Sequence, residues 1–155
     1  MSVEVSSRQT EIIEAAAKLL TTVGVSGLTI KNLAKEMQFS ESAIYRHFQS
    51  KEEIILTMLD YVLTGVSNET IAAMSADLSP ADMLKLLFQK HFAFFHQHPY
   101  LTVVIFSDGL LEESKRINEK ILLIMNSRKI IMEPLVVQAQ ANGELTKNLS
   151  AEDIV

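Results

Sequence analysis

The sequence predicts an all-α protein in which three short N-terminal helices precede one long helix and a helical core. Apolar residues recur at spacings of three and four, which is the period of an amphipathic helix and not of a strand. Residues that favour helix starts open each of these stretches. The 155 residues are 48% hydrophobic and include no Cys, so a packed core has to form without disulfides or a Cys-ligated zinc ion.

The first two helices are bounded by residues that start and stop helices. The first helix is expected over about Ser7–Thr22, and Gly24 can close it in a left-handed conformation. Thr29 is a good N-cap for a short second helix. The apolar residues of this second helix are Ile30, Leu33, Ala34 and Met37.

The third and fourth helices follow without a long linker. Ser40 caps a third helix, which is expected over Glu41–Phe48. Ser50, with Glu53 three residues later, forms a capping box that opens a fourth helix. This fourth helix is expected to run continuously over about residues 51–73.

A fifth helix begins after a change in composition. Ser79, Pro80 and Asp82 have the spacing of an N-cap, a first helical residue and a first-turn acid. Pro99 stops this helix near His98, because proline cannot continue a helix.

The next stretch combines a turn with another long helix. After the short apolar segment Leu101–Phe106, a turn is expected at Ser107–Gly109. A helix should then run over about Leu110–Asn142 and end at Gly143. Pro134 lies inside this helix and should kink or divide it.

The end of the sequence predicts one more helix start. Ser150 is a cap, and the acids Glu152 and Asp153 follow it in the first turn. Because the sequence stops at Val155, we expect a fold that is truncated at its C-terminus. The long helix before it should then expose an apolar surface around Ile121, Ile124, Ile131 and Leu135.

Charge is distributed unevenly along the chain. The net charge is −5, yet the first 50 residues hold five basic and five acidic residues and are neutral. A neutral segment on an acidic body can contact phosphate only where a few cations and backbone amides are well placed. We therefore expect weak non-specific affinity for nucleic acid.

The second helix, the turn Gln38–Ser40 and the third helix have the lengths of a helix-turn-helix, whose second helix enters a major groove. On a helical wheel Ile44 and Phe48 form one stripe, which has to pack on the first two helices. The opposite face presents Ser42, Ala43 and Arg46, and the flanks present Tyr45 and His47. A phenol and an imidazole on the flanks can donate to the phosphate walls of a groove.

Two stretches of the chain resemble the DNA-binding domain of TetR-family transcriptional regulators. They are Gly27–Ala34 and Ser42–Glu53, and the likeness extends over about Arg8–Leu59. The Tyr-x-His-Phe-x-x-Lys pattern stands at the right distance from the Thr-x-x-x-Leu-Ala helix. The resemblance implies an all-helical homodimer, with a DNA-binding domain over residues 1–50 and a ligand-binding and dimerisation core over residues 51–155.

The resemblance also implies a function and contacts at individual positions. Proteins of this family usually repress transcription from a palindromic operator in double-stranded DNA until a small molecule binds, and here we expect a hydrophobic effector. Carried over by position, phosphate contacts fall at Thr29, Tyr45, His47 and Lys51. Base contacts fall at Lys31, Glu41, Ser42 and Ala43, beside Arg46 on the same exposed face. Glu41 could accept only from a cytosine amine, and Ala43 could touch only a thymine methyl.

Structural roles are the alternative for several of these residues. Thr29 could serve only as a cap, Tyr45 could be half packed in the domain core, and Lys51 could only face solvent.

An apolar ligand pocket is expected between the later helices. Its candidate residues are Met58, Tyr61, Phe88, His91, Phe92, Phe95, Phe106 and Met125. Pockets in helical bundles are apolar with a few polar groups that orient the ligand. The candidates for that polar role are Tyr61, His91, His96 and Asn126. Phe and Met are also ordinary core residues, so simple packing is the alternative.

Other classes of protein are disfavoured. His91, His96 and His98 cannot share one helical face at spacings of five and two, so no metal site is expected. No Gly-x-Ser-x-Gly, P-loop, paired-His zinc or dinucleotide-binding pattern occurs, so neither an enzyme nor a cofactor is expected. The chain lacks a signal pattern and a membrane-length apolar run, which predicts a cytoplasmic protein that does not bind membranes. The alternative function is a helical small-molecule-binding module without sequence-specific DNA binding.

Overall fold

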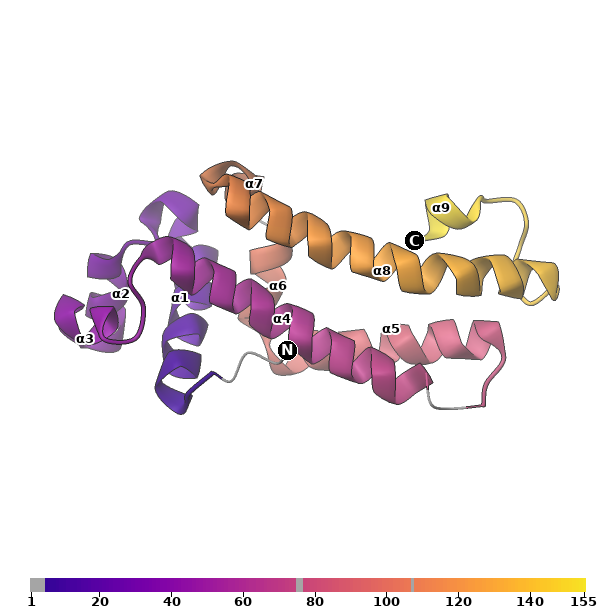
Figure 1. Ribbon diagram of the computed structural model, residues 1–155, viewed down its shortest axis with the longest axis horizontal. Coiled ribbons are helices and arrows are strands. Elements are labelled where there is room, and N and C mark those ends of the chain that lie inside the picture. Colours follow the sequence, from indigo (N-terminus) through magenta and orange to yellow (C-terminus); the bar gives the residue numbers. More distant parts are fainter. Residues whose placement is uncertain (1–4, 75–76, 107) are drawn as a thin grey trace. The chain divides into compact units, whose positions relative to one another are not determined.

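The computed structural model describes residues 5–74, 77–106 and 108–155, and all of its regular elements there are helices (Figure 1). The helices in chain order are α1 Ser7–Gly27, α2 Ile30–Met37, α3 Glu41–Tyr45, α4 Lys51–Met74, α5 Pro80–Gln97, α6 Pro99–Phe106, α7 Asp108–Glu113, α8 Lys115–Ala141 and α9 Ala151–Ile154. The predicted all-α class, with short N-terminal helices before a long one, is confirmed. Among the described residues, no helix is both long enough and apolar enough to cross a membrane.

The chain forms two compact units. Unit 1 comprises Met1–Thr64 and His98–Ile121, and unit 2 comprises Gly65–Gln97 and Leu122–Val155. In unit 1, α1 packs against α2, α6 and α7, and α2 packs against α3. Its buried side chains include Ile12, Ile13, Leu20, Leu33, Ile44, Phe48, Ile55, Leu101 and Leu110.

Hydroxyl side chains cap the N-termini of α2 and α3, as the sequence predicts. Thr29 Oγ1 accepts a hydrogen bond from the Asn32 N–H at 3.1 Å, which caps α2. Ser40 Oγ caps α3 by accepting from the Ala43 N–H at 3.2 Å. These caps matter because a short helix leaves most of its N–H groups without an intrahelical partner.

The capping box at the start of α4 forms only in part. Ser50 Oγ accepts from the Glu53 N–H at 3.1 Å, as predicted. The Glu53 carboxylate accepts from the N–H of Gln49 at 2.6 Å, one residue before the cap itself. Both bonds satisfy N–H groups at the helix entry, so the predicted start is confirmed and the reciprocal bond differs in its donor.

The first helix breaks at the predicted glycine, and the third helix ends earlier than predicted. Gly24 interrupts α1 with a positive φ of 70°, although its ψ of −176° is extended, and the chain then makes a further short helical stretch to Gly27. The regular part of α3 ends at Tyr45 instead of Phe48. The N–H groups of His47 and Phe48 still bond to the Ile44 carbonyl at 2.9 and 3.1 Å, so the chain remains turned beyond the helix.

The last long helix is divided at Ser114 and not at Pro134, which corrects the predicted division, whereas a kink at Pro134 stays a prediction. Ser114 caps α8, because its Oγ accepts from the Ile117 N–H at 3.2 Å. The helix continues through Pro134. Proline has no N–H to donate to the Ile130 carbonyl four residues earlier, and its ring crowds that carbonyl, yet the helix is not divided there.

The prediction of a turn at Ser107–Gly109 is also wrong for the two residues that the structure describes, Asp108 and Gly109. Asp108 and Gly109 lie within α7, whereas Ser107 is outside the described residues. The apolar segment before it forms the helix α6.

Unit 2 is built around an apolar cluster shared by α5, α8 and α9. Leu84, Met132, Val136 and Ala139 are buried in it, and Ala151 and Ile154 pack against it. Gly143 ends α8 with φ 76°, and the Glu144 N–H bonds back to the Ala139 carbonyl at 2.8 Å. Ser150 caps α9 as predicted.

The apolar surface predicted on the long helix is on the wrong face. Ile121 and Ile124 are buried, and Ile131 and Leu135 are partly buried against the clusters of unit 2. The exposed apolar residues of α8 are instead Leu122, Leu123, Met125, Ile130 and Val137. The helix has two apolar stripes, and a period of three and four does not show which of them packs inward.

Three helices of unit 2 meet in a chain of hydrogen bonds. Thr70 Oγ1 donates to the Val66 carbonyl at 2.9 Å and lies 3.3 Å from Nε2 of His91. Arg128 Nη1 lies 2.8 Å from Nδ1 and 2.5 Å from Nε2 of the same ring, so the guanidinium donates to the imidazole. A neutral imidazole fits this arrangement, because an imidazolium has no lone pair to accept a bond from a guanidinium.

We predict that this chain of bonds makes the free energy of unfolding depend on pH. Burial, and then the charge of Arg128, lower the pKa of His91 from 6.5 to about 4. Above pH 6.5 the imidazole is neutral in the folded and the unfolded chain. As the pH falls from about 6.5 to about 4, only the unfolded chain takes up the proton, so stability falls over this window.

The measurement is urea unfolding at pH 7 and pH 4.5, with His91→Gln as the test variant. Glutamine keeps a donor and an acceptor but does not titrate, so the variant should lose about 1 kcal/mol less stability than wild type, allowing for solvent screening. His96→Gln, at an exposed histidine of α5, is the control and should behave like wild type. An equal loss in wild type and His91→Gln would contradict the prediction.

Candidate nucleic-acid interface

The turn between α2 and α3 has a backbone conformation that positions α3. Gln38 adopts the left-handed conformation at φ 56° and ψ 39°, and among the described non-glycine residues only Gln38 has a positive φ. Its N–H bonds to the Lys35 carbonyl at 3.2 Å, and the Phe39 N–H bonds to the Ala34 carbonyl at 2.8 Å. These bonds end α2 and turn the chain toward the Ser40 cap. A glutamine gives no sequence signal for this conformation.

The inward side of α3 is anchored as predicted. Ile44 and Phe48 are buried. Gln9 Nε2 on α1 donates to the His47 carbonyl at 3.4 Å, and the Arg8 guanidinium lies 5.1 Å from the centre of the Phe39 ring. Two contacts from α1, which the sequence does not reveal, therefore hold the turn and the end of α3.

The outward side of α3 presents the predicted set of side chains. Glu41, Ser42, Tyr45 and Arg46 are exposed, and Ala43 and His47 are partly exposed. Tyr45 is 51% exposed, so its ring is not enclosed in the core. The Ser42 hydroxyl lies 2.9 Å from the Ser40 hydroxyl, which keeps Ser42 close to the start of the helix.

Two DNA-contact candidates lie at the start of α2. Thr29, the expected phosphate contact and N-cap, and Lys31, an expected base contact, are both exposed. Thr29 uses an oxygen lone pair for its cap, and its hydroxyl hydrogen is still able to donate. A cap and a phosphate contact are therefore compatible at Thr29, and the two interpretations of this residue do not compete.

Lys51 has partners that the sequence does not reveal. Its Nζ donates to the Val25 carbonyl at 2.9 Å and pairs with Glu113 of α7 at 2.6 Å. The adjacent Glu52 accepts from Ser114 Oγ at 2.6 Å and from Arg116 Nη1 at 3.1 Å. The idea that Lys51 only faces solvent is therefore wrong. We call these six residues the α4-start junction.

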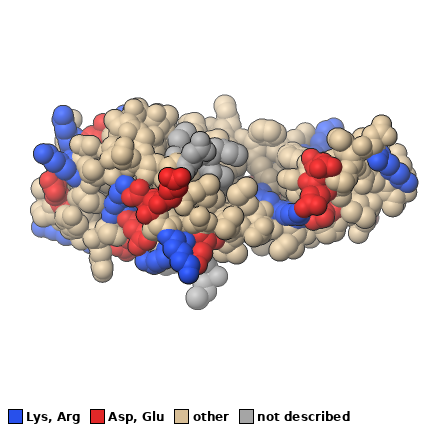
Figure 2. All heavy atoms as spheres, turned by 90° about the horizontal axis from the view of Figure 1, so that it is seen from above, with Lys and Arg blue, Asp and Glu red and all other residues tan. Residues whose placement is uncertain are grey.

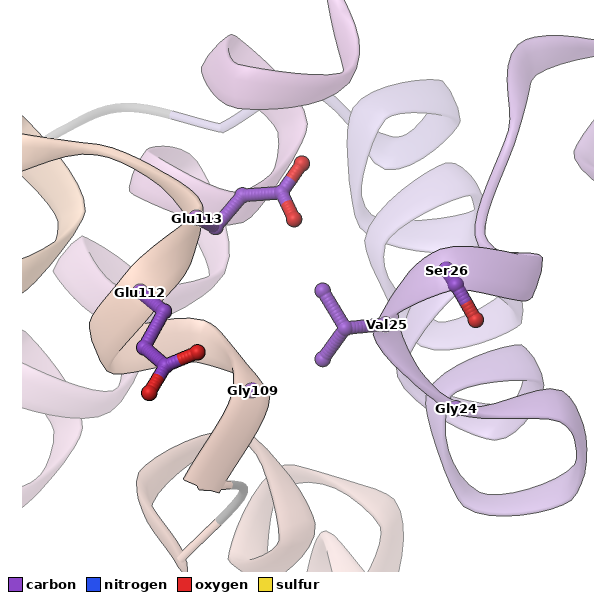
Figure 3. A pocket seen from close by; sticks show the side chains of 6 residues that line it. All are labelled: Gly24, Val25, Ser26, Gly109, Glu112 and Glu113. Carbon is purple, nitrogen blue, oxygen red and sulfur yellow. The ribbon is translucent and has the colours of Figure 1, made fainter.

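A shallow pocket of about 520 Å³ borders this junction (Figure 3). It is lined by Gly24, Val25, Ser26, Gly109, Glu112 and Glu113. Figure 3 shows the Val25 side chain pointing from α1 toward α7, with the Glu113 carboxylate on the α7 side. The lining brings together the glycine break of α1 and the acids of α7, which the sequence separates by more than eighty residues.

Charges of both signs are interspersed on the surface drawn in Figure 2. Within the first 50 residues, Lys18 pairs with Glu36 at 2.6 Å, and Arg8 pairs with Glu11. Such pairs reduce the positive field that a phosphate backbone would meet, in agreement with the neutral charge of the first 50 residues.

The residues of the predicted ligand pocket fall in both units. Met58 is buried in unit 1, where the Tyr61 and His98 rings meet edge to face at 5.5 Å. In unit 2, Phe95 packs edge to face on Phe94 at 5.4 Å, and His91 belongs to the hydrogen-bond chain. The exposed members are Phe88, Met125 and Phe92, the last of them 72% exposed. The side chain of Phe106 lies outside the described residues, and the pocket itself stays a prediction.

Sequence reasoning did not select Thr70 or Arg128, the partners of His91. A lone Thr and a lone Arg on different helices give no pattern, because the contact depends on how three helices pack.

The comparisons with known proteins agree with this geometry. The family model for bacterial regulatory proteins of the tetR family matches residues 12–58, which include α2, α3 and the start of α4. The nucleoid occlusion factor SlmA of Vibrio atlanticus is 28% identical over 117 residues, which are 75% of this chain and 60% of that protein. SlmA of Vibrio cholerae is 28% identical over 116 residues, or 74% of this chain and 59% of that protein. The chain thus spans about three fifths of the length of these relatives.

Solved structures share the fold at low sequence identity. The ketosteroid transcriptional regulator KstR2 of Mycobacterium tuberculosis has a TM-score of 0.84 at 21% identity, over 96% of this chain and 76% of that one. The regulator PfmR from Thermus thermophilus has a TM-score of 0.75 at 23% identity, and the match covers 90% of this chain and 75% of that one. The tetR-family model therefore matches the segment that carries the helix-turn-helix, and the chain shares its all-helical fold with these solved regulators.

Proposed function

We propose that the chain is a ligand-responsive transcriptional repressor, which binds a palindromic operator as a homodimer and is released by a small hydrophobic effector. Residues 1–50 form the DNA-binding domain in this proposal, and residues 51–155 belong to the ligand-binding and dimerisation core. The observation that carries it is the orientation of α3. Its apolar residues Ile44 and Phe48 are buried, while Glu41, Ser42, Tyr45 and Arg46 face outward.

The outward residues divide into two chemical groups. Thr29, Tyr45, His47 and Lys51 offer hydroxyl, imidazole and ammonium donors, which suit phosphate oxygens and carry no base identity. The proposed base-reading residues are Lys31, Glu41, Ser42, Ala43 and Arg46. Arg46 and Lys31 can donate to guanine, whereas Glu41 can accept from cytosine. Two copies of α3 have to lie about 34 Å apart to read one palindrome, which is why the proposal requires a two-fold dimer.

Structures that share the fold support the effector. One of them, with a TM-score of 0.77 at 16% identity, is AibR in complex with isovaleryl coenzyme A and operator DNA. Another is the fatty acid degradation regulator FadR from Bacillus halodurans, with a TM-score of 0.74 at 17% identity. By analogy we propose an effector with an apolar body, and a cytoplasmic protein with access to operator DNA.

A second candidate function is nucleoid occlusion. The curated relatives from Vibrio atlanticus and Vibrio cholerae are nucleoid occlusion factors, and their similarity covers about three quarters of this chain. Both functions need the same DNA-binding face. They differ in how DNA binding is regulated, because only the repressor requires a small molecule that lowers the affinity for DNA.

We predict that replacing Tyr45 by Phe and His47 by Ala weakens binding to all DNA sequences by a similar factor. The lost hydrogen bonds to phosphate should lower the affinity for specific and non-specific DNA alike, because phosphate contacts carry no base identity. Fluorescence anisotropy measures this, with a duplex that the protein selects from a random pool and one scrambled duplex.

The matched control replaces Tyr100 by Phe and His96 by Ala, because both are exposed residues outside the DNA-binding segment. This control should bind like wild type. An unchanged affinity for both duplexes in the Tyr45 and His47 variant would contradict the assignment of α3 as the DNA-contacting helix.

We also predict that Glu113→Gln tightens DNA binding. Glu113 pairs with Lys51 in the absence of DNA, so this carboxylate competes with phosphate for the same ammonium group. Removing a partly exposed partner of this kind should raise the affinity by about twofold to fivefold, the equivalent of about 0.4–1 kcal/mol. The same anisotropy experiment measures the change.

Glu112→Gln controls for the loss of one negative charge next to the same site, since Glu112 is exposed and makes no described bond to Lys51. The competition is refuted if both variants change the affinity equally.

A further inference from the structure

Arg128 occupies a position in unit 2 where an arginine needs a particular partner. Residues four positions before and after it on α8 are Ile124 and Met132, which are 3% and 6% exposed. Arg128 therefore lies on the stripe of α8 that packs inward. Its hydrogen bonds go to His91 of α5, and His91 in turn contacts the buried Thr70 of α4.

None of the described carboxylates pairs with this guanidinium. Glu69, the acid closest in sequence to Thr70, pairs with Lys90 at 3.2 Å. Arg128 has five N–H donors, and its bonds to described residues all end on the His91 ring. Every fully buried side-chain nitrogen and oxygen among the described residues has a partner, so the remaining donors of Arg128 retain access to solvent.

This arrangement is unfavourable for a protein with nothing bound. A cation on the inward stripe of a helix loses hydration, and a neutral imidazole does not compensate its charge. In agreement, burial lowers the pKa of Arg128 to about 10. A carboxylate would offset this loss best, because its two oxygens match the planar fork of a guanidinium.

We propose that Arg128 binds the carboxylate of an amphipathic small molecule, with His91 holding the guanidinium in place. The inference rests on the proposed effector function and specifies the class of effector, an acid with an apolar body. The apolar body would meet the large side chains that share helix faces with the pair, which are Phe88 and Phe95 on α5 and Met125 on α8. Phe88 and Met125 are exposed and so available to a ligand.

The test uses sodium octanoate as the probe, with octan-1-ol and sodium acetate as its apolar-only and charge-only counterparts. Isothermal titration calorimetry should show saturable binding of octanoate to the wild-type protein. Octan-1-ol and acetate should each bind at least about tenfold more weakly, since hydrogen bonds to a charged group and apolar contact both contribute. Arg128→Met should lose about tenfold or more in octanoate affinity.

Lys129→Met is the matched control. It removes the neighbouring cation of α8, which pairs with Glu152 of α9. Its octanoate affinity should stay within about twofold of wild type. If Arg128→Met does not fold, NMR of the wild-type protein decides. The guanidinium N–H signal of Arg128 is assigned as the one that disappears in Arg128→Lys. Octanoate should shift this signal in the wild-type spectrum, and octan-1-ol should leave it unchanged.

Three results would overturn the inference: no saturable octanoate binding, equal octanoate affinity in wild type and Arg128→Met, or equal affinity of the wild type for octanoate and octan-1-ol. The proposed function is tested separately by DNA binding of the wild-type protein without octanoate. Normal DNA binding with no octanoate binding would refute the carboxylate site alone, whereas absent DNA binding would refute the proposed repressor.

Discussion

The burial of Ile44 and Phe48 is the constraint on which the proposed function depends. α3 is only five residues long, and a helix of that length has no stability of its own in water. Its position comes from these two anchors, from the Ser40 cap and from the left-handed turn at Gln38. Because the anchors fix the rotation of α3 about its axis, they also decide which side chains face outward. Loss of either anchor would therefore remove the outward surface together with the helix.

Two polar clusters involve α4, one in each unit. The α4-start junction ties Lys51 and Glu52 to α7 and α8, and the chain of bonds at Thr70, His91 and Arg128 ties α4, α5 and α8 together. α4 contributes to both clusters as one continuous helix over Lys51–Met74. A ligand at Arg128 could influence DNA binding only through a difference in affinity between two arrangements of such elements, and operator DNA would then change ligand affinity by the same factor.

The helix caps and helix ends could be predicted from the sequence, because the hydrogen bonds that form them join residues three to five positions apart. The caps at Thr29, Ser40 and Ser150 and the helix end at Gly143 depend on neighbouring backbone groups, and all four are confirmed. The division at Ser114 was not predicted, although Ser114 caps α8 through the Ile117 N–H by the same local rule as the other caps. The inward stripe of α8 was also misjudged, since both of its stripes are apolar.

The candidate site was predictable only where a spacing pattern exists. The outward residues of α3 follow from helix geometry and from the resemblance of Tyr45–Lys51 to a known pattern. The partners of Lys51 and His91 come from distant parts of the chain, Glu113 and Arg128, and no local rule places them. Long-range contacts of charged groups depend on helix packing, which the period of apolar residues leaves open.

The central claim, that α2 and α3 form the DNA-contacting surface, is tested most directly by NMR of backbone amides with a duplex that the protein selects from a random pool. The account predicts that the largest shifts on DNA binding fall at Thr29, Lys31, residues 41–47 and Lys51. Shifts concentrated in unit 2, or a selected duplex that leaves the amides of α3 unchanged, would contradict it.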